Sequence, residues 1–359
     1  MLEYVLALVL AFVLSVLLTP VARRLAFRLG SVHYPKAISI DTHVNPIPYL
    51  GGLPILVAAL VTSLVLAPGP FTWWPVLVGA IVVAGGALID DAKALSVGGK
   101  LISQFVAAVF LLVVGRQIIG IPSVFNYGII DVTITFIWLV GMMNAVNFLD
   151  IMDGLAGGVS TMAAIGFAGI ALLLGNEVVA IMALAVAGGS IGFLIFNFNP
   201  AKIFMGDTGS QFLGLMLAVF PLMLLKGVTA VTGREIIITN QRVVFLTLIV
   251  LAIPLFEMTF TSTIRAINGK APWMGSKDHF PLRCFARGYS VRQIVVTVYG
   301  VGATLALLSI GLTLSQPAWV YLTLAALVVA AGFFSLWLTR MQLPKIVSPI
   351  QKEKVQKAG

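Results

Sequence analysis

Two adjacent carboxylates are the first residues in this sequence that could do chemistry. Asp90 and Asp91 lie in the segment ALIDDAKALSVGGK, where an apolar stretch ends, and Lys100 closes that segment. Neighbouring side chains on a helix point about 100° apart, so both carboxylates can reach one cation from different directions. Such a pair is equally typical of charged residues that mark the end of a membrane-spanning helix at the level of the lipid headgroups. The two aspartates alone therefore do not decide between these interpretations.

A second segment, NAVNFLDIMDGLAGG, carries amides and carboxylates at three-residue spacing. On a helix this spacing gathers them along one face, and the residues are Asn144, Asn147, Asp150 and Asp153. Solvated polar residues at a helix end would look partly similar. Because Asn and Asp are poor helix formers, four of them on one stripe beside an apolar stretch favour a binding role.

A third segment, FNFNPAKIFMGDTGS, places Asp207 between Gly206 and Gly209. The glycines free the backbone, and the hydroxyls of Thr208 and Ser210 can bind oxygen ligands or cap a helix. A purely structural N-cap is the alternative interpretation, although helix N-termini also attract phosphate. No lysine follows as it would in a Walker A loop, so the segment is not a nucleotide P-loop.

Together these segments indicate one kind of chemistry. Carboxylates, amides and lysines predict a hard cation, Mg²⁺ with Mn²⁺ as an alternative, that bridges the phosphates of a charged substrate. We expect a lipidic acceptor, since a soluble acceptor gives no reason to build the site into a bilayer. The residues therefore predict lipid-linked phosphoryl transfer.

The elements that must position these residues are apolar helices. The chain has 359 residues, of which 60% are apolar and 10% charged, whereas soluble domains carry roughly 25% charged residues. Its mean hydropathy is +1.07. We predict an all-α polytopic membrane protein with one domain over 1–340 and a basic cytoplasmic tail over 341–359. The single cysteine, Cys284, excludes an intramolecular disulfide and a cysteine-based metal site.

Stretches of roughly 20 apolar residues are needed to cross a hydrocarbon core. Applied along the chain, this length predicts 10 or 11 spans. Their ranges are near 2–20, 50–67, 73–89, 100–119, 132–147, 159–175, 178–196, 209–226, 243–264, 291–314 and 318–339.

The basic residues predict the orientation. With eleven spans, all but four of the 22 Lys and Arg residues fall on one side, which the positive-inside rule makes cytoplasmic. The N-terminus is then outside, and the tail and the three acidic segments are cytoplasmic. We expect a location in the inner membrane. Contact with anionic headgroups explains the net charge of +9, so no nucleic acid partner is predicted.

The order of the three segments resembles the polyprenyl-phosphate N-acetylhexosamine-1-phosphate transferases. The upstream segment THVNPIPYLGG is similar to the H-x-x-P-x-P-x-x-G-G motif of that family. The resemblance covers residues 43–290. It implies that a UDP-sugar and polyprenyl phosphate react, with Mg²⁺, to give polyprenyl-diphospho-sugar and UMP.

The resemblance also implies roles for individual residues. The three carboxylates would be catalytic, with Asp207 as a metal ligand and with Asp90 and Asp91 serving the lipid phosphate and the metal. The nucleotide and sugar pocket would be lined by Asn144, Asn147, Asp150, Asp153, Phe204, His279 and Arg283, and the phosphates would meet Lys100, Asn197 and His43. We expect direct attack on the β-phosphorus, with Asp90 or Asp91 as a proton acceptor; a covalent aspartyl-phosphate route is the alternative.

One departure bears on the sugar. The last cytoplasmic loop of the family carries a histidine cluster ahead of an arginine, whereas SKDHFPLRCFARGYS keeps only His279 and Arg283. Pro281 and Leu282 stand where two histidines are usual. We therefore favour UDP-GlcNAc, with UDP-MurNAc-pentapeptide or another UDP-N-acetylhexosamine as the alternative.

Two other classes of protein, a membrane transporter and an inactive scaffold, are alternatives to an enzyme. An ion-coupled transporter or lipid flippase should carry charges near the membrane midplane, where Glu257 is the one candidate, and we leave it outside the site. An inactive scaffold conflicts with the intact acidic segments. The expected partners are the UDP-sugar, polyprenyl phosphate and the membrane, and a homodimer is an open alternative.

Overall fold

The computed structural model describes residues 1–34, 45–69, 71–93, 95–120, 128–227, 240–271 and 278–340. Helices dominate these ranges, as predicted. The described residues also form one antiparallel pair of two-residue strands, β1 (Val32–His33) and β2 (Ile47–Pro48), in which Val32 lies opposite Pro48. Strands of two residues are too short to be recognised from the sequence pattern.

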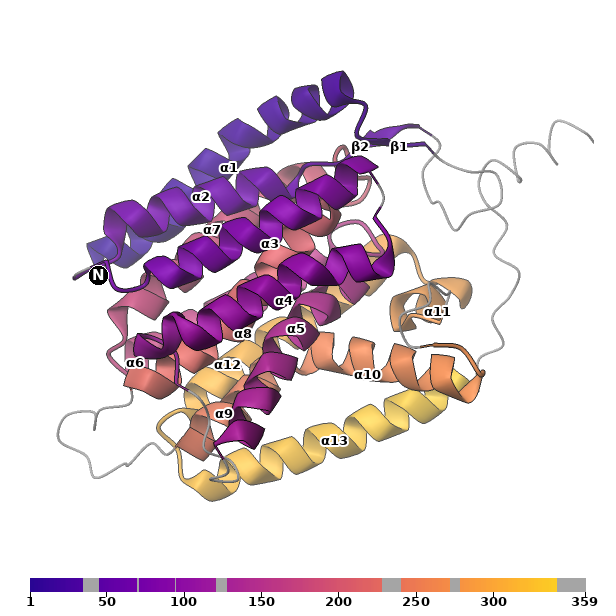
Figure 1. Cartoon of the computed structure of the whole chain (residues 1–359). Helices are drawn as coiled ribbons and strands as arrows, with labels where there is room; N and C mark the ends of the chain where they lie inside the picture. The colour runs from indigo at the N-terminus through magenta and orange to yellow at the C-terminus, as the bar shows by residue number, and fades with distance from the viewer. Residues whose placement is uncertain are drawn as a thin grey trace, which may run out of the picture.

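The helices are arranged as a bundle, with α1 and α2 along one side and α13 along the opposite side (Figure 1). In chain order they are α1 (Leu2–Leu29), α2 (Gly52–Leu66), α3 (Trp74–Lys93), α4 (Val97–Val113), η1 (Gly115–Gln117), α5 (Ile129–Leu149), α6 (Leu155–Leu173), α7 (Glu177–Asn197), α8 (Gly206–Gly227), α9 (Asn240–Val250), α10 (Ala252–Ile267), α11 (Phe280–Ala286), α12 (Val291–Leu312) and α13 (Pro317–Thr339).

Each predicted span overlaps at least one helix, but the count of eleven membrane crossings stays a prediction. Eight of the described helices are long and apolar enough to cross a membrane, and a ninth crossing results if α9 and α10 count as one span. The 15 residues of α2 and the 17 of α4 reach only about 22 and 26 Å at 1.5 Å per residue. The chain is a multi-pass membrane protein by these criteria.

The predicted span 243–264 is broken into two helices. α9 and α10 meet at an angle of 73°. Pro254 lies in the first turn of α10, where its missing N–H cannot continue the hydrogen-bond ladder from α9. The break therefore follows from the proline, which the apolar composition of the stretch conceals.

The bundle is built around α8. The 18 residues of its most apolar window are all buried, whereas only 6% of the corresponding window of α13 is buried. Small residues allow α1 to approach α7 closely, because a Cβ on Gly188 would lie 2.2 Å from the carbonyl oxygen of Leu8. The rigid centre thus holds the N-terminus of α8, and α13 lies at the margin.

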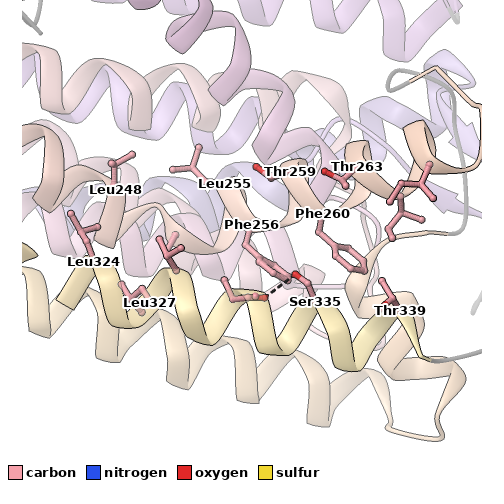
Figure 2. A pocket seen from close by; sticks show the side chains of 16 residues that line it. Leu248, Leu255, Phe256, Thr259, Phe260, Thr263, Leu324, Leu327, Ser335 and Thr339 are labelled. Atoms are coloured by element: carbon pink, nitrogen blue, oxygen red, sulfur yellow. Dashed lines mark hydrogen bonds between the residues drawn. The ribbon is translucent and has the colours of Figure 1, made fainter. Parts of the chain in front are cut away.

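An apolar groove of about 460 Å³ runs between α10 and α13 (Figure 2). Phe256 and Phe260 point into it from α10, and Leu324 and Leu327 line it from α13. Its chemistry suits a hydrocarbon chain.

Candidate functional site

Three carboxylates meet at one end of the bundle. Asp90 and Asp91 lie in the last turn of α3, and Asp207 lies in the first turn of α8. One oxygen atom from each carboxylate can be chosen so that all three lie within 4.8 Å of one another. The structure thus brings together the three aspartates that the sequence analysis had assigned to a shared cation. We call them the acid cluster.

Lys100 lies between two members of the acid cluster. Its Nζ is 2.6 Å from Oδ2 of Asp90 and 2.8 Å from Oδ2 of Asp207. The turn before it is fixed at two points, since Leu95 N donates to Asp90 Oδ1 at 2.7 Å and Ser96 Oγ caps α4 by accepting from Gly99 N. The start of α4 therefore aims the lysine at the acids.

Asn147 joins α5 to the acid cluster. Its Nδ2 donates to Oδ1 of Asp207 at 2.9 Å and to Oγ of Ser210 at 3.0 Å. α5 and α8 approach closely because a Cβ on Gly214 would lie 2.5 Å from the Cα of Met143. Asn147 consequently fixes the rotamer of Asp207 from a separate helix.

Asp91 holds the N-terminus of α8. Its Oδ1 accepts from the backbone N–H of Asp207 at 2.9 Å, and its Oδ2 accepts from Thr208 N at 3.1 Å and Thr208 Oγ1 at 2.7 Å. The first N–H groups of a helix have no partner within it. The cap of α8 is therefore the carboxylate of Asp91 in α3, and not the side chain of Asp207 or Ser210.

The glycines of the third segment are required by close packing. Gly206 has φ +71°, and a Cβ there would lie 2.7 Å from Oδ2 of Asp91. Gly52 packs backbone to backbone on Gly209, where a Cβ on Gly52 would lie 2.1 Å from the Gly209 nitrogen. Larger residues would push α8 away from Asp91.

The segment Pro48–Gly52 supports the loop before α8 through backbone hydrogen bonds. Phe204 N donates to Pro48 O at 2.9 Å, while Gly51 N donates to Phe204 O at 2.9 Å and Gly52 N to Met205 O at 2.8 Å. From the sequence, PIPYLGG is recognisable only as part of a family motif. Its physical role in the structure is to hold the third segment in place.

Asp150 lies beside the acid cluster at the C-terminal end of α5. It is half-buried, and its carboxylate accepts no hydrogen bond within the described part of the chain. Burial, together with the negative charges of Asp207, Asp91 and Asp153, raises the pKa of Asp150 to about 8. A carboxyl group of this kind is available to a ligand.

Three residues that were predicted to line the site instead hold neighbouring helices and loops together. Asn144 donates to Gln104 Oε1 at 2.7 Å and so joins α5 to α4. Oδ2 of Asp153 accepts from the side chain of Asn199 at 2.9 Å and from Ala201 N at 3.0 Å.

Asn197 is the third of these residues. It accepts from Gly154 N and donates to Ile203 O, both at 2.9 Å. Because its amide is buried and bonded at both ends, it positions the loops around the acid cluster.

Phe204 takes part in an aromatic group. Its ring centroid is 5.8 Å from that of His33 and 5.8 Å from that of Tyr49, and Tyr49 Oη lies 3.2 Å from His33 Nδ1. His33 of β1 therefore contacts both of these rings. His43 lies outside the described residues.

His279 and Arg283 are both buried, and their hydrogen bonds are to residues outside the acid cluster. The ring of His279 contacts Glu257 and Arg265. Arg283 donates to the side chain of Asp278 at 3.2 Å and to Leu338 O at 3.2 Å. Arg265 could not be recognised from its sequence context, whereas Glu257 was recognisable as an acid within an apolar span.

The donor set of the acid cluster suits a divalent cation. Carboxylate oxygens are the hard ligands that Mg²⁺ and Mn²⁺ prefer. A positive charge, the Lys100 ammonium, already lies between Asp90 and Asp207. The carboxylate of Asp91 accepts three hydrogen bonds from α8. In the described part of the chain, the carboxylates of Asp90 and Asp207 accept none from α8, so their oxygen atoms are the better placed to bind a metal ion.

The chain is similar in sequence to known transferases. A model of the family described as glycosyl transferase family 4 matches residues 73–225. The chain is 31% identical to a probable undecaprenyl-phosphate N-acetylglucosaminyl 1-phosphate transferase of Bacillus subtilis, over 93% of this chain and 92% of the relative. It is 30% identical to a decaprenyl-phosphate N-acetylglucosaminephosphotransferase of Mycobacterium tuberculosis, covering 80% and 77%. A phospho-N-acetylmuramoyl-pentapeptide-transferase of Halalkalibacterium halodurans is 33% identical, covering 86% and 98%.

Proposed function

The chain belongs to the phosphosugar transferases of glycosyl transferase family 4, and we propose that it transfers GlcNAc 1-phosphate from UDP-GlcNAc to polyprenyl phosphate. The products are polyprenyl-diphospho-GlcNAc and UMP, and the product lipid begins a cell-envelope glycan. The observation that carries this proposal is the acid cluster with Lys100 between two of its carboxylates. The transferred group is a phosphate, and this arrangement has the charges that phosphate chemistry needs.

In the proposed reaction an oxygen of the lipid phosphate attacks the β-phosphorus of UDP-GlcNAc. A new phosphorus–oxygen bond forms, the bond from the β-phosphorus to the bridging oxygen breaks, and UMP leaves with the electron pair. The second pKa of a phosphate monoester is near 6, so the nucleophile is mostly dianionic at neutral pH. A strong general base is therefore unnecessary, and the main barrier is the approach of two anions.

Residues of the chain lower this barrier by supplying and orienting charge. Lys100 has three N–H donors, of which two contact Asp90 and Asp207, leaving a third for a phosphate oxygen. Asn147 keeps Asp207 in one rotamer. Asp91 keeps the N-terminus of α8, with its positive end, directed at the same place.

We propose that Asp90 and Asp207 hold a Mg²⁺ ion, with Asp91 close by. A bound divalent cation supplies positive charge that screens the phosphates and stabilises charge on the transferring group. Mn²⁺ has the same ligand preference and is expected to substitute for it.

The choice of GlcNAc is supported by two features. Two of the relatives described above act on N-acetylglucosamine, by their names. The loop that resembles the histidine-rich loop of the family has Pro281 and Leu282 where two histidines are usual, and both residues are buried. UDP-MurNAc-pentapeptide is the alternative, supported by the third relative.

The lipid acceptor is supported by the apolar groove between α10 and α13 (Figure 2). Phe260 lines this groove, and the guanidinium of Arg283 lies 5.5 Å from its ring. A polyprenyl chain needs an apolar surface of this kind within the membrane. The positive-inside pattern supports a cytoplasmic location for the acid cluster, where UDP-sugars are available.

The test is a transfer assay with the purified full-length protein. The protein is incubated with undecaprenyl phosphate and, in separate reactions, UDP-GlcNAc, UDP-GalNAc or UDP-MurNAc-pentapeptide, each with Mg²⁺ or with EDTA. We expect UMP from UDP-GlcNAc only when lipid and Mg²⁺ are both present. Release of UDP would indicate transfer of the sugar without its phosphate and would contradict the proposal, as would no release with any sugar.

A further inference from the structure

Glu257 is a carboxylate buried in the interior of the bundle. It lies in α10 and has no exposed surface. Its Oε1 accepts from Thr261 Oγ1 at 2.9 Å and contacts His279 Nδ1, and its Oε2 accepts from Phe280 N at 3.2 Å. A buried carboxylate is costly unless hydrogen bonds satisfy it. These three donors, two of them from the start of α11, join α10 to α11.

The partners of His279 determine where its ring carries a proton. Its Nε2 lies 3.2 Å from Nη2 of Arg265. A guanidinium has only N–H donors, so Nε2 must be the acceptor of this hydrogen bond. The proton of a neutral ring then lies on Nδ1, from which it is donated to Glu257. Both ring nitrogens are thus engaged by the protein.

This group of residues reaches the acid cluster through Phe148. The guanidinium of Arg265 lies 4.9 Å from the centroid of the Phe148 ring, and the His279 ring meets the same ring edge-on at 5.9 Å. Phe148 follows Asn147 in α5, and Asn147 donates to Asp207. The end of α5 that carries Asn147 is therefore supported by His279 and Arg265.

We propose that Glu257, His279 and Arg265 form a buried positioning unit for the transfer reaction. The unit fixes the Phe148 end of α5, so that Asn147 and Asp150 face the acid cluster. His279 acts as the neutral Nδ1–H tautomer that holds Arg265, and it does not touch the nucleotide, the sugar or a phosphate. Its effect on turnover rests on the proposed function, whereas its tautomer does not.

The tautomer is measured directly by ring ¹⁵N NMR. The chain has three histidines, so a preparation labelled with ¹⁵N-histidine gives three ring spin systems. The ring signals that are lost in either His279→Asn or His279→Gln belong to His279. In spectra recorded at pH 8 we expect a protonated Nδ1 and an unprotonated Nε2 for His279. A ring protonated on Nε2, or on both nitrogens, would overturn the proposal whether or not the protein transfers any sugar.

Two variants of His279 separate its two contacts. In His279→Gln the side-chain oxygen can take the place of Nε2 and accept from Arg265. In His279→Asn the side-chain nitrogen can take the place of Nδ1 and donate to Glu257, but the acceptor for Arg265 is lost. We expect the kcat of the Asn variant to be at least about tenfold lower than the kcat of the Gln variant. In the Gln variant, the KM for the UDP-sugar should stay within about twofold of the wild-type value.

Equal kcat values, or a higher kcat for the Asn variant, would overturn the positioning unit. An increase in KM alone in both variants would also overturn it, because it would place His279 on the substrate. If one variant does not fold, as judged by size-exclusion chromatography and thermal unfolding, the NMR measurement on the wild-type protein still decides. No UMP release from the wild type, together with the predicted tautomer, would reject the proposed function and leave the tautomer assignment intact.

Discussion

Asp91 and Thr208 are joined by two hydrogen bonds, although 117 positions separate them in the chain. Oδ2 of Asp91 accepts from both the backbone N–H and the hydroxyl of Thr208. The carboxylate at the end of α3 therefore determines where α8 begins, and with it the position of Asp207. Hydrogen bonds to charged groups contribute about 1.5–3 kcal/mol each, which is enough to hold a catalytic geometry.

Thr208→Ala removes the hydroxyl from this contact but leaves the backbone amide. We predict that kcat falls about tenfold or more, because the start of α8 is then held less firmly, while Thr208→Ser stays within about threefold of wild type. UMP release under saturating substrates measures both. Equal activity of the Ala variant and the wild type would show that the hydroxyl contact with Asp91 has no role in transfer.

Lys100→Met removes the ammonium from between Asp90 and Asp207. We predict a loss of turnover of about a hundredfold or more, because a donor for the phosphates is missing. Mn²⁺ should bind as tightly as before or more tightly, because a competing positive charge has gone. Lys93→Met is the control, since Lys93 is an exposed residue of the same region. Retained turnover in Lys100→Met, or a loss of Mn²⁺ binding, would refute this role.

Asp150 should make folding stability depend on pH. Its pKa is raised from 3.8 to about 8 in the folded protein, so between these values the unfolded chain has lost a proton that the folded chain keeps. The stability present below pH 3.8 is then lost progressively as the pH rises towards 8. Asp150→Asn cannot ionise, so its Tm should exceed that of wild type by a margin that grows with pH.

Thermal unfolding in detergent with EDTA, from pH 5 to pH 8, measures this margin. Asp153→Asn is the matched control. Its carboxylate accepts hydrogen bonds from Asn199 and Ala201, so this variant should lose stability instead. A Tm of Asp150→Asn that stays below wild type, or a margin that does not change with pH, would contradict the burial of an ionisable carboxyl at position 150.

Gly206→Ala should disrupt the site while leaving the rest of the bundle folded. The new Cβ would lie 2.7 Å from Oδ2 of Asp91, in a backbone conformation with φ +71°. We predict a loss of turnover of about a hundredfold. Gly85→Ala serves as the control, since a Cβ at Gly85 in α3 meets no neighbouring atom within 4 Å. Wild-type turnover in Gly206→Ala would mean that Asp91 need not contact α8 closely.

The sequence was sufficient to predict an all-α polytopic membrane chain and the convergence of the acid cluster. Hydropathy dictates which stretches are helical in a bilayer, because backbone groups there must bond within their own segment. The break at Leu251 was missed because a proline in the first turn of a helix is compatible with an uninterrupted apolar stretch. The short helix α11 was missed because seven residues carry too little periodicity to be recognised.

The division of roles among polar residues could not be predicted. Asn and Asp side chains satisfy backbone groups as readily as they bind ligands. Spacing placed Asn144 and Asn147 on one stripe, yet Asn144 contacts Gln104 and Asn147 contacts Asp207. Only the packing of α4 and α8 on either side of α5 distinguishes them. The same reasoning applies to Asn197, whose amide is bonded at both ends to backbone groups.

Binding of Mn²⁺ to the purified protein, followed by electron paramagnetic resonance with Mg²⁺ as competitor, tests the shared cation most directly. The acid cluster predicts one tight Mn²⁺ site per chain, and the affinity of this site should fall at least about tenfold in Asp90→Asn and in Asp207→Asn. The control variant Asp278→Asn alters the ion pair with Arg283 and should bind Mn²⁺ as the wild type does. If folded Asp207→Asn binds Mn²⁺ as tightly as the wild type, the cation lies elsewhere and the proposed chemistry of the acid cluster is wrong.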